Sequence, residues 1–253
     1  MSAPPSALRT LAFGDLGPTV WGAGWIADPA GTALTALGDG GERTAMTTLR
    51  LSTGQDGDDW RLDADRATLL VAPAGDAVAV RAFDNQLEGF DQLCRVTGRF
   101  ELDGTEHAVD CLGLRTWWPG AVDLERFESI RSVSSWFEPD EGLALTAFRT
   151  RKARAHDGDA IAAAVIAPDG STAVEDPRLS TTYEAGGWPL RAGLELWVAG
   201  EEPDQQYPRR ASGEATGARA QVTAGELDVR AEPFRWHSRG RDGAGMYILA
   251  RRR

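Results

Sequence analysis

The sequence is poor in the residues that build disulfide and metal frameworks. Its 2 cysteines, Cys94 and Cys111, are too few for a disulfide scaffold. Its 3 histidines, His107, His156 and His237, are far apart and form no HxH or HxxxH pattern, so a metal site is not expected. A nucleophile elbow, a P-loop and a glycine-rich dinucleotide motif are also missing. We therefore expect chemistry without a metal or other cofactor.

Long apolar runs and positive charge are equally scarce. No run of about 18 apolar residues is present, so neither a transmembrane helix nor membrane insertion is expected. The N-terminal stretch has neither the basic start nor the apolar core of a signal peptide, which favours a cytoplasmic location. The net charge is −11, whereas phosphate binding requires clustered Lys and Arg, so nucleic acid is not expected as a partner.

Tryptophan and glycine are abundant, with 9 and 29 residues against 3 tyrosines. Short apolar runs alternate with Gly, Pro and Asp turns along the chain. This pattern predicts roughly a dozen or more short strands, and hence an all-β barrel or sandwich. The helix candidates are 84–92 and 122–129, each of at most two or three turns.

The chain is also expected to contain two irregular stretches and one internal boundary. Residues 1–18 read as an irregular lead-in, and the polar stretch 203–217 reads as an exposed loop. The chain changes direction just after Trp118-Pro119-Gly120. We therefore predict two consecutive barrel-like halves, 1–122 and 123–253.

The clearest local signal is a hairpin between residues 92 and 115, turned at Asp103-Gly104. Both positions of such a turn need a positive φ, which Asp and Gly tolerate. The turn sets the register and pairs Leu102 with Thr105. Alternation then gives one mostly apolar face, made of Cys94, Val96, Phe100, Leu102, His107, Val109 and Cys111. The opposite face is polar and carries Arg95, Thr97, Arg99, Glu101, Glu106 and Asp110.

Two residues of this hairpin are candidates for acid–base chemistry. His107 is either a half-exposed histidine at the rim of the sheet or a catalytic base. Asp110 lies diagonal to Arg95 and Arg99 in the predicted register. It either belongs to a surface ion-pair cluster or, if this face lines a closed barrel, is a buried site acid held by the arginines. The sequence leaves both choices open.

Aromatic and basic residues follow the hairpin at Arg115-Thr116-Trp117-Trp118. Arg115 and Trp117 continue the apolar face, and Trp118 points the opposite way. An arginine at the edge of an apolar face is costly unless it is paired or stacked. We take Arg115 as a candidate for fixing a carbonyl or carboxylate of a ligand. The alternative is that the indoles cap a barrel end and one of them stacks on Arg115.

The segment 109–120, VDCLGLRTWWPG, resembles a motif of the calycin-like family that includes carotenoid hydratases (hydroxyneurosporene synthase-like proteins) and AttH-like proteins. The motif is a hairpin that ends in Gly-x-Arg-x-x-Trp followed by Gly, matched here by Gly113, Arg115, Trp118 and Gly120. The resemblance implies two lipocalin-like antiparallel β-barrels in one chain. It also implies an apolar pocket, since some members hydrate isoprenoids and related proteins close polyketide rings.

Aromatic residues elsewhere are further candidates for ligand binding. Trp136 is expected to shape a pocket together with Trp117 and Trp118. Tyr183 and Trp188 flank a Gly-Gly break and are placed to line an opening. The last two candidates, Trp236 and His237, lie on one predicted strand and face opposite ways. His237 would orient a polar ligand group if it pointed inward.

Three functions remain open from the sequence. The first is an enzyme that binds a small apolar or amphipathic molecule, isoprenoid or polyketide-like, and hydrates, isomerises or cyclises it. Asp110 would then be the acid or its orienter, and the indoles would stabilise developing positive charge. The second is a non-catalytic carrier with the same cavity. The third is a β-sandwich carbohydrate binder with exposed tryptophans. A monomer or a homodimer is expected.

Overall fold

The computed structural model describes residues 6–15, 20–27, 31–38, 43–54, 58–153, 158–198 and 208–253. As predicted, the fold is all-β and barrel-like, with two ten-stranded sheets and a single 3₁₀ turn, Leu124–Arg126, within these ranges. No helix in the described parts of the chain has the length and apolar character needed to cross a membrane.

The first sheet, called sheet A, comes from the N-terminal part of the chain. Its strands are β1 (Ser6–Phe13), β2 (Trp21–Ala27), β3 (Gly31–Leu37), β4 (Arg43–Met46), β5 (Leu49–Thr53), β6 (Trp60–Ala64), β7 (Ala67–Pro73), β8 (Val78–Ala82), β9 (Leu87–Leu102) and β10 (Thr105–Val122).

The second sheet, called sheet B, follows the 3₁₀ turn. Its strands are β11 (Phe127–Phe137), β12 (Glu141–Thr150), β13 (Asp159–Ile166), β14 (Thr172–Ala173), β15 (Asp176–Tyr183), β16 (Pro189–Trp197), β17 (Arg209–Ala215), β18 (Ala220–Ala224), β19 (Leu227–Ser238) and β20 (Arg241–Arg252).

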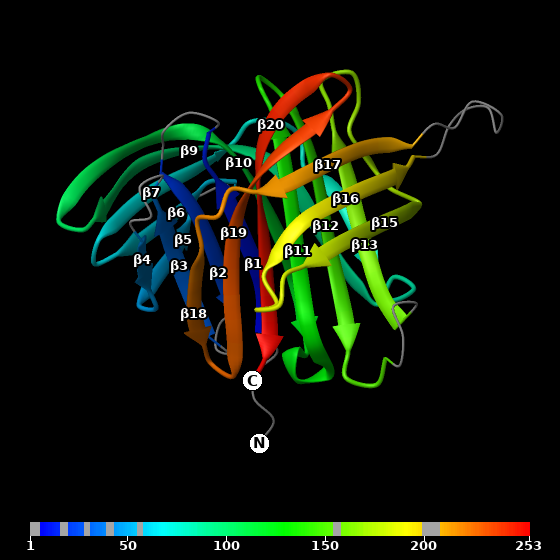
Figure 1. Cartoon of the computed structure of the whole chain (residues 1–253), viewed down its shortest axis with the longest axis horizontal. Helices are drawn as coiled ribbons and strands as arrows, with labels where there is room; N and C mark the ends of the chain where they lie inside the picture. The colour runs from blue at the N-terminus through cyan, green and yellow to red at the C-terminus, as the bar shows by residue number, and fades with distance from the viewer. Residues whose placement is uncertain are drawn as a thin grey trace.

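The two sheets have the same strand order. Sheet A runs β4-β3-β2-β1-β10-β9-β7-β6-β5, with β8 paired to β9. Sheet B runs β14-β13-β12-β11-β20-β19-β17-β16-β15, with β18 paired to β19. Each strand of sheet B therefore repeats the position of the strand ten places earlier. Figure 1 shows the two sheets side by side, with β1 and β20 near the middle of the molecule.

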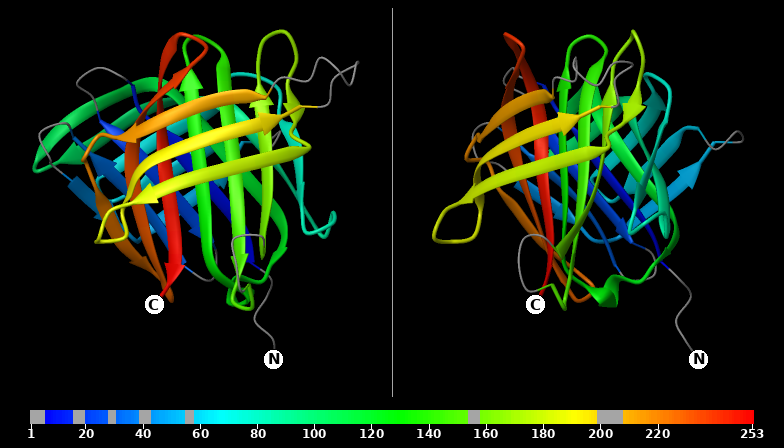
Figure 2. Two further views of the ribbon diagram at one scale, coloured as in Figure 1. Left: turned by 45° about the vertical axis from the view of Figure 1, so that its right-hand side comes forward. Right: turned by 90° about the vertical axis from the view of Figure 1, so that its right-hand side faces the viewer.

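Both sheets curl, so that each encloses an apolar interior and the two share a third apolar core (Figure 2). Sheet A encloses a cluster that includes Phe13, Trp60 and Phe100. Sheet B encloses another, with Phe234 and Trp236 among its members. The third cluster contains residues of both sheets and therefore lies between them, which makes the two barrels one packed unit.

The predicted hairpin is present with the expected register. Leu102 pairs with Thr105, and the pairing continues without a shift as far as the partners Phe90 and Trp117. Asp103 and Gly104 have φ values of 48° and 80°, as a two-residue turn of this kind requires. The apolar face of the hairpin lines the interior of sheet A, and the polar face is exposed.

Four local expectations were wrong. The stretch 1–18 contains the central strand β1, and 203–217 contains β17. No helix forms over 84–92, because Phe83, Asp84 and Asn85 have positive φ values and make a turn from which β9 begins at Leu87. Over 122–129 only the short 3₁₀ turn forms before β11 starts.

Gly98, in the middle of β9, is a glycine that the fold requires. Its φ is +139°, and a Cβ there would lie 2.1 Å from the carbonyl oxygen of Thr68 on β7. We expect Gly98→Ala to lower the free energy of unfolding by about 2 kcal/mol or more, through strain and overpacking. Urea denaturation measures the change. Gly120→Ala, where no atom lies within 4 Å of the added Cβ, is the control, and equal effects of the two variants would contradict the argument.

Candidate functional site

A pair of tyrosine hydroxyls lies in the interior of sheet B. Tyr247 on β20 is fully buried, and its hydroxyl lies 2.9 Å from the hydroxyl of Tyr183 and 3.2 Å from that of Thr181. Thr181 and Tyr183 are two residues apart on β15, so alternation places them on the same face of this strand. Burial raises the pKa of Tyr247, so its phenol stays protonated and can donate a hydrogen bond.

A buried ion pair faces the same interior. The guanidinium of Arg131, on β11, donates a hydrogen bond to the carboxylate of Asp159 at the start of β13. Both side chains are almost fully buried. The Nε atom of Arg131 and the Oδ1 atom of Asp159 have no hydrogen-bond partner among the described residues. The pair therefore keeps one free donor and one free acceptor in a buried setting, where an unmade hydrogen bond is costly.

These groups border a cavity of about 520 Å³ at one end of sheet B. Tyr183 and Arg131 both line it, beside Leu249 of β20. Tyr183 is 40% exposed and therefore reaches from the solvent-filled space to the buried Tyr247. The remaining lining residues are Glu128, Ser129, Arg149, Thr150, Arg151, Ala153, Gly187 and Arg251. We call this space the sheet B cavity, and its volume falls in the range of ordinary small-molecule sites.

The turn between β15 and β16 is fixed by a second polar network. Trp188 lies between two guanidinium groups, with Arg219 at 5.2 Å and Arg230 at 5.1 Å from its ring. Arg219 also bonds to Glu184 at 2.6 Å and to the buried Glu232 at 2.9 Å. Burial raises the pKa of Glu232 to about 7, although Arg219 opposes this shift. The network holds the turn whose Gly187 lines the sheet B cavity.

Arg115 lies in the other interior, that of sheet A. Only 2% of it is exposed, and its Nε and Nη2 atoms donate to Oε1 of Gln92 at 2.9 and 2.6 Å. Its guanidinium stacks over Trp60 at 4.8 Å, and burial lowers its pKa. Arg9 stacks on the neighbouring Trp117, at 4.8 Å. Stacking on an indole was the alternative that the sequence left open for Arg115, but the stacking partner is Trp60 on β6 and not one of the neighbouring tryptophans.

The two acid–base candidates of the hairpin do not line the sheet B cavity. Asp110 is 66% exposed on the outer face, where its Oδ1 accepts a hydrogen bond from Nε of Arg95 at 2.6 Å. This hydrogen bond holds the pKa of Asp110 below its usual range. His107 is half-buried near the hairpin turn. Asp110 and Arg115 therefore point to opposite faces of β10 and do not share an enclosed space.

The tryptophan candidates are distributed over all three apolar clusters. Trp118 packs edge-on against Phe148 in the core between the sheets, with ring centroids 5.1 Å apart. Trp136 lies in the same core and donates its indole hydrogen bond to the carbonyl oxygen of Gly14 at 3.0 Å. Trp117 lies in sheet A and Trp236 in sheet B. These four indoles therefore do not line one common pocket.

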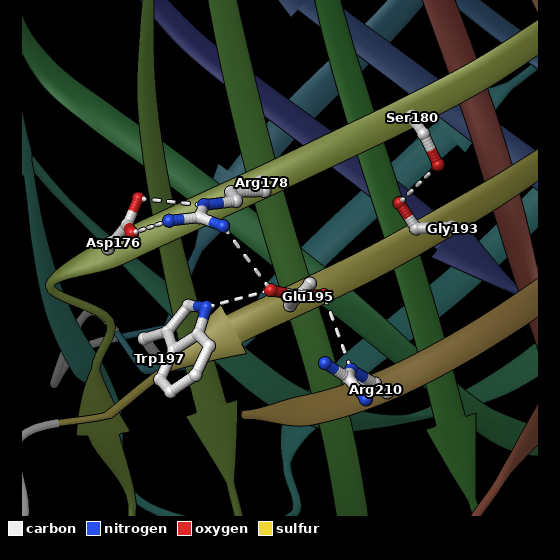
Figure 3. A network of polar contacts seen from close by, with 7 residues as sticks. All are labelled: Asp176, Arg178, Ser180, Gly193, Glu195, Trp197 and Arg210. Atoms are coloured by element: carbon white, nitrogen blue, oxygen red, sulfur yellow. Dashed lines mark hydrogen bonds and ion pairs between the residues drawn. The ribbon is translucent and has the colours of Figure 1, made fainter. Parts of the chain in front are cut away.

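The outer face of sheet B carries a groove of about 530 Å³ over β15, β16 and β17. Figure 3 shows its central ion pairs, in which Arg178 contacts Asp176 and Glu195, and Arg210 also contacts Glu195. His237 lines this groove and pairs with Asp242 at 3.0 Å, so it faces outward. Arg178, Glu195, Arg210 and His237 of this groove are engaged in ion pairs, and exposed ion pairs contribute little energy.

Sequence reasoning missed the residues that carry the most chemistry in the structure. They include Arg131, Asp159 and Tyr247, none of which the sequence singled out. A further one is Asp91 on β9, which is 1% exposed in the core between the sheets. Its Oδ1 atom accepts a hydrogen bond from Thr116 at 2.5 Å, whereas its Oδ2 atom has no partner among the described residues. Burial raises the pKa of Asp91 to about 7.

No protein-family model and no curated protein matches this chain. Solved structures with a similar fold include kievitone hydratase from Nectria haematococca, with a TM-score of 0.63 and 10% identity over 97% of this chain and 88% of that chain. An AttH-type protein from Nitrosomonas europaea gives a TM-score of 0.58 and 10% identity, over 97% of this chain and 92% of that one. The structure of CghA with Sch210972 gives a TM-score of 0.63 and 13% identity, over 98% of this chain and 89% of that chain.

These similarities cover nearly the whole chain and include an AttH-type protein and a hydratase. The resemblance found in segment 109–120 therefore led to the correct fold, a chain with two lipocalin-like halves. A shared fold does not define a reaction, because chemistry depends on the residues of the site.

Proposed function

We propose that the protein binds a small, largely apolar molecule in the sheet B cavity and catalyses its hydration, isomerisation or cyclisation with a tyrosine as the acid. The observation that carries this proposal is the hydrogen bond between Tyr183, which lines the cavity, and the buried Tyr247. The hydratase among the proteins of similar fold adds support to the reaction class.

The chemistry follows from the protonation state of the buried phenol. Tyr247 stays neutral and can donate its proton to the hydroxyl oxygen of Tyr183, which leaves the proton of Tyr183 free to face a ligand. A phenol that donates to a ligand carbonyl draws electrons from a conjugated double bond. In a hydration, water then adds to the electron-poor end of this double bond. In a cyclisation, another carbon of the same molecule adds there instead. Arg131, which also lines the cavity, supplies positive charge beside the ligand.

This proposal replaces Asp110 by Tyr183 as the acid. An ionised, exposed carboxylate that is already paired with Arg95 is poorly suited to donate a proton to an enclosed ligand. The structure gives no support to the carbohydrate platform either. Of the 9 tryptophans, Trp21, Trp25, Trp60, Trp118, Trp136 and Trp236 are fully buried, and stacking on a sugar requires an exposed ring.

The test begins with binding and then measures turnover. Purified protein is titrated with a panel of isoprenoid and polyketide-like enones while tryptophan fluorescence is recorded. Bound compounds are then incubated with the protein and examined by mass spectrometry. A mass gain of one water indicates hydration, and a changed retention time at constant mass indicates isomerisation or cyclisation. Binding without conversion would favour the carrier, and the absence of binding would overturn the proposal.

Tyr183→Phe is expected to lower turnover by about 100-fold or more while ligand affinity changes only a few-fold, because general acids contribute about that much. Tyr247→Phe should have a smaller effect in the same direction, since it removes only the hydrogen bond that positions Tyr183. Asp110→Asn on the outer face is the control and should convert substrate like the unchanged protein. Full turnover in Tyr183→Phe would contradict the assignment of the acid.

A further inference from the structure

The charge around the sheet B cavity is opposite to that of the whole protein. The chain has a net charge of −11, yet among the described residues that line this cavity there are four arginines and a single acidic residue, Glu128. The four are Arg131, Arg149, Arg151 and Arg251. In an acidic protein, a pocket lined by cations attracts anions and repels ligands that carry positive charge.

Two of these arginines are already engaged. Arg131 is paired with Asp159, and Nε of Arg251 lies 3.7 Å from Oε1 of Glu128. Arg149 and Arg151 form no ion pair with any residue in the described ranges. Asp159 stands opposite Arg149 in the register of β12 and β13, but it is engaged by Arg131. The cavity therefore presents two guanidinium groups whose charge the described part of the chain does not compensate.

The position of these groups defines how a ligand would lie. Arg149 is half-buried at the end of β12 and Arg151 is exposed just beyond it, so both lie at the rim. Arg131 is a further guanidinium of the cavity lining, although its Nε atom is itself buried. Leu249 and Ala153 supply apolar surface. Guanidinium groups match the geometry of a carboxylate, which they bind with paired hydrogen bonds.

We infer that the ligand of the sheet B cavity carries a carboxylate, held at the rim by Arg149 and Arg151, with its apolar body against Leu249. This inference rests on the proposed function, since it names the class of molecule that the same cavity accepts. The anionic group fixes the orientation of the ligand and leaves the opposite part of the molecule to face Tyr183.

The test compares two probes of similar size and different charge, anthracene-9-carboxylate and anthracene-9-methanol. The unchanged protein should bind the carboxylate at least about tenfold more tightly, because hydrogen bonds between charged groups contribute more than neutral ones. Added salt should weaken this preference, since one of the arginines is exposed. The double variant Arg149→Gln/Arg151→Gln should bind both probes with the affinity that the alcohol has for the unchanged protein.

The control is Arg81→Gln, which removes an exposed arginine paired with Glu88 on sheet A and should keep the full preference. Equal affinity of the two probes for the unchanged protein would overturn the inference, and so would a preference that persists in the double variant. If the two probes bind equally well and Tyr183→Phe still loses turnover, only the claim about the anionic group fails. If neither probe binds and no enone is converted, the proposed function fails with it.

Discussion

Trp118→Ala is expected to lower the free energy of unfolding by about 3–5 kcal/mol, which is the usual cost of truncating a fully buried tryptophan. Trp118 is 0% exposed and packs on Phe148 of the other sheet. The cavity left behind would border strands of both sheets, and collapse from either side is limited because both backbones are hydrogen-bonded. Urea denaturation followed by circular dichroism measures the loss.

The same variant tests whether the two sheets unfold together. If the shared core joins them, hydrogen exchange should speed up in peptides of sheet A and sheet B alike. Trp197→Ala removes a half-buried indole from the outer face of β16 and should cost no more than about 1 kcal/mol. Faster exchange confined to sheet A would show that the barrels unfold independently.

Asp91→Asn is expected to stabilise the protein most above neutral pH and by a smaller amount in mild acid. Burial raises the pKa of Asp91 from 3.8 to about 7. At pH values between these two pKa values, the folded chain keeps a proton that the unfolded chain releases. The free energy of unfolding therefore falls as the pH rises from about 4 to about 7 and is constant above about pH 7. The loss above this pH is up to about 4 kcal/mol, at about 1.36 kcal/mol per pKa unit. An uncharged amide avoids it and can still accept the hydrogen bond from Thr116.

The measurement is the urea midpoint of both proteins at about pH 5 and about pH 9. The variant should gain midpoint at both values and clearly more at about pH 9, because at about pH 5 only the part of the loss that accrues between pH 3.8 and 5, about 1.6 kcal/mol, has occurred. Asp110→Asn is a matched control, since it makes the same change on the same hairpin at an exposed site whose pKa is lowered by Arg95. A gain of equal size at both values would indicate that something other than the charge of Asp91 is responsible.

The fold could be predicted where a strand has one solvent face. Strands β9 and β10 alternate between buried and exposed positions over most of their length, so the turn at Asp103-Gly104 fixed which residues share a face. The enclosed face is the apolar one, which left Asp110 in solvent. Arg115 and Trp117 also lie on the predicted face of β10. Nothing in the local pattern indicated that the stacking partner of Arg115 would be Trp60 on β6.

The candidate site could not be predicted because its strands lack this contrast. Nearly every residue of β11 is buried, since one face lines sheet B and the other packs in the shared core. Alternation therefore gave no reason to single out Arg131. The contact between Tyr183 and Tyr247 spans 64 residues and joins β15 to β20, which are not hydrogen-bonded neighbours. Only the curvature of the sheet brings these two hydroxyls together.

The repeated strand order allows the two barrels to divide their tasks. In the interior of sheet A, Arg115 stacks on Trp60 and donates hydrogen bonds to the amide oxygen of Gln92, so these side chains fill the space. In sheet B an open space borders Tyr183 and the arginine rim. A chain with two copies of one architecture can reserve the first as a rigid scaffold and let the lining of the second change from one ligand to another. Substitutions at the rim of the sheet B cavity then leave the packing of sheet A unchanged.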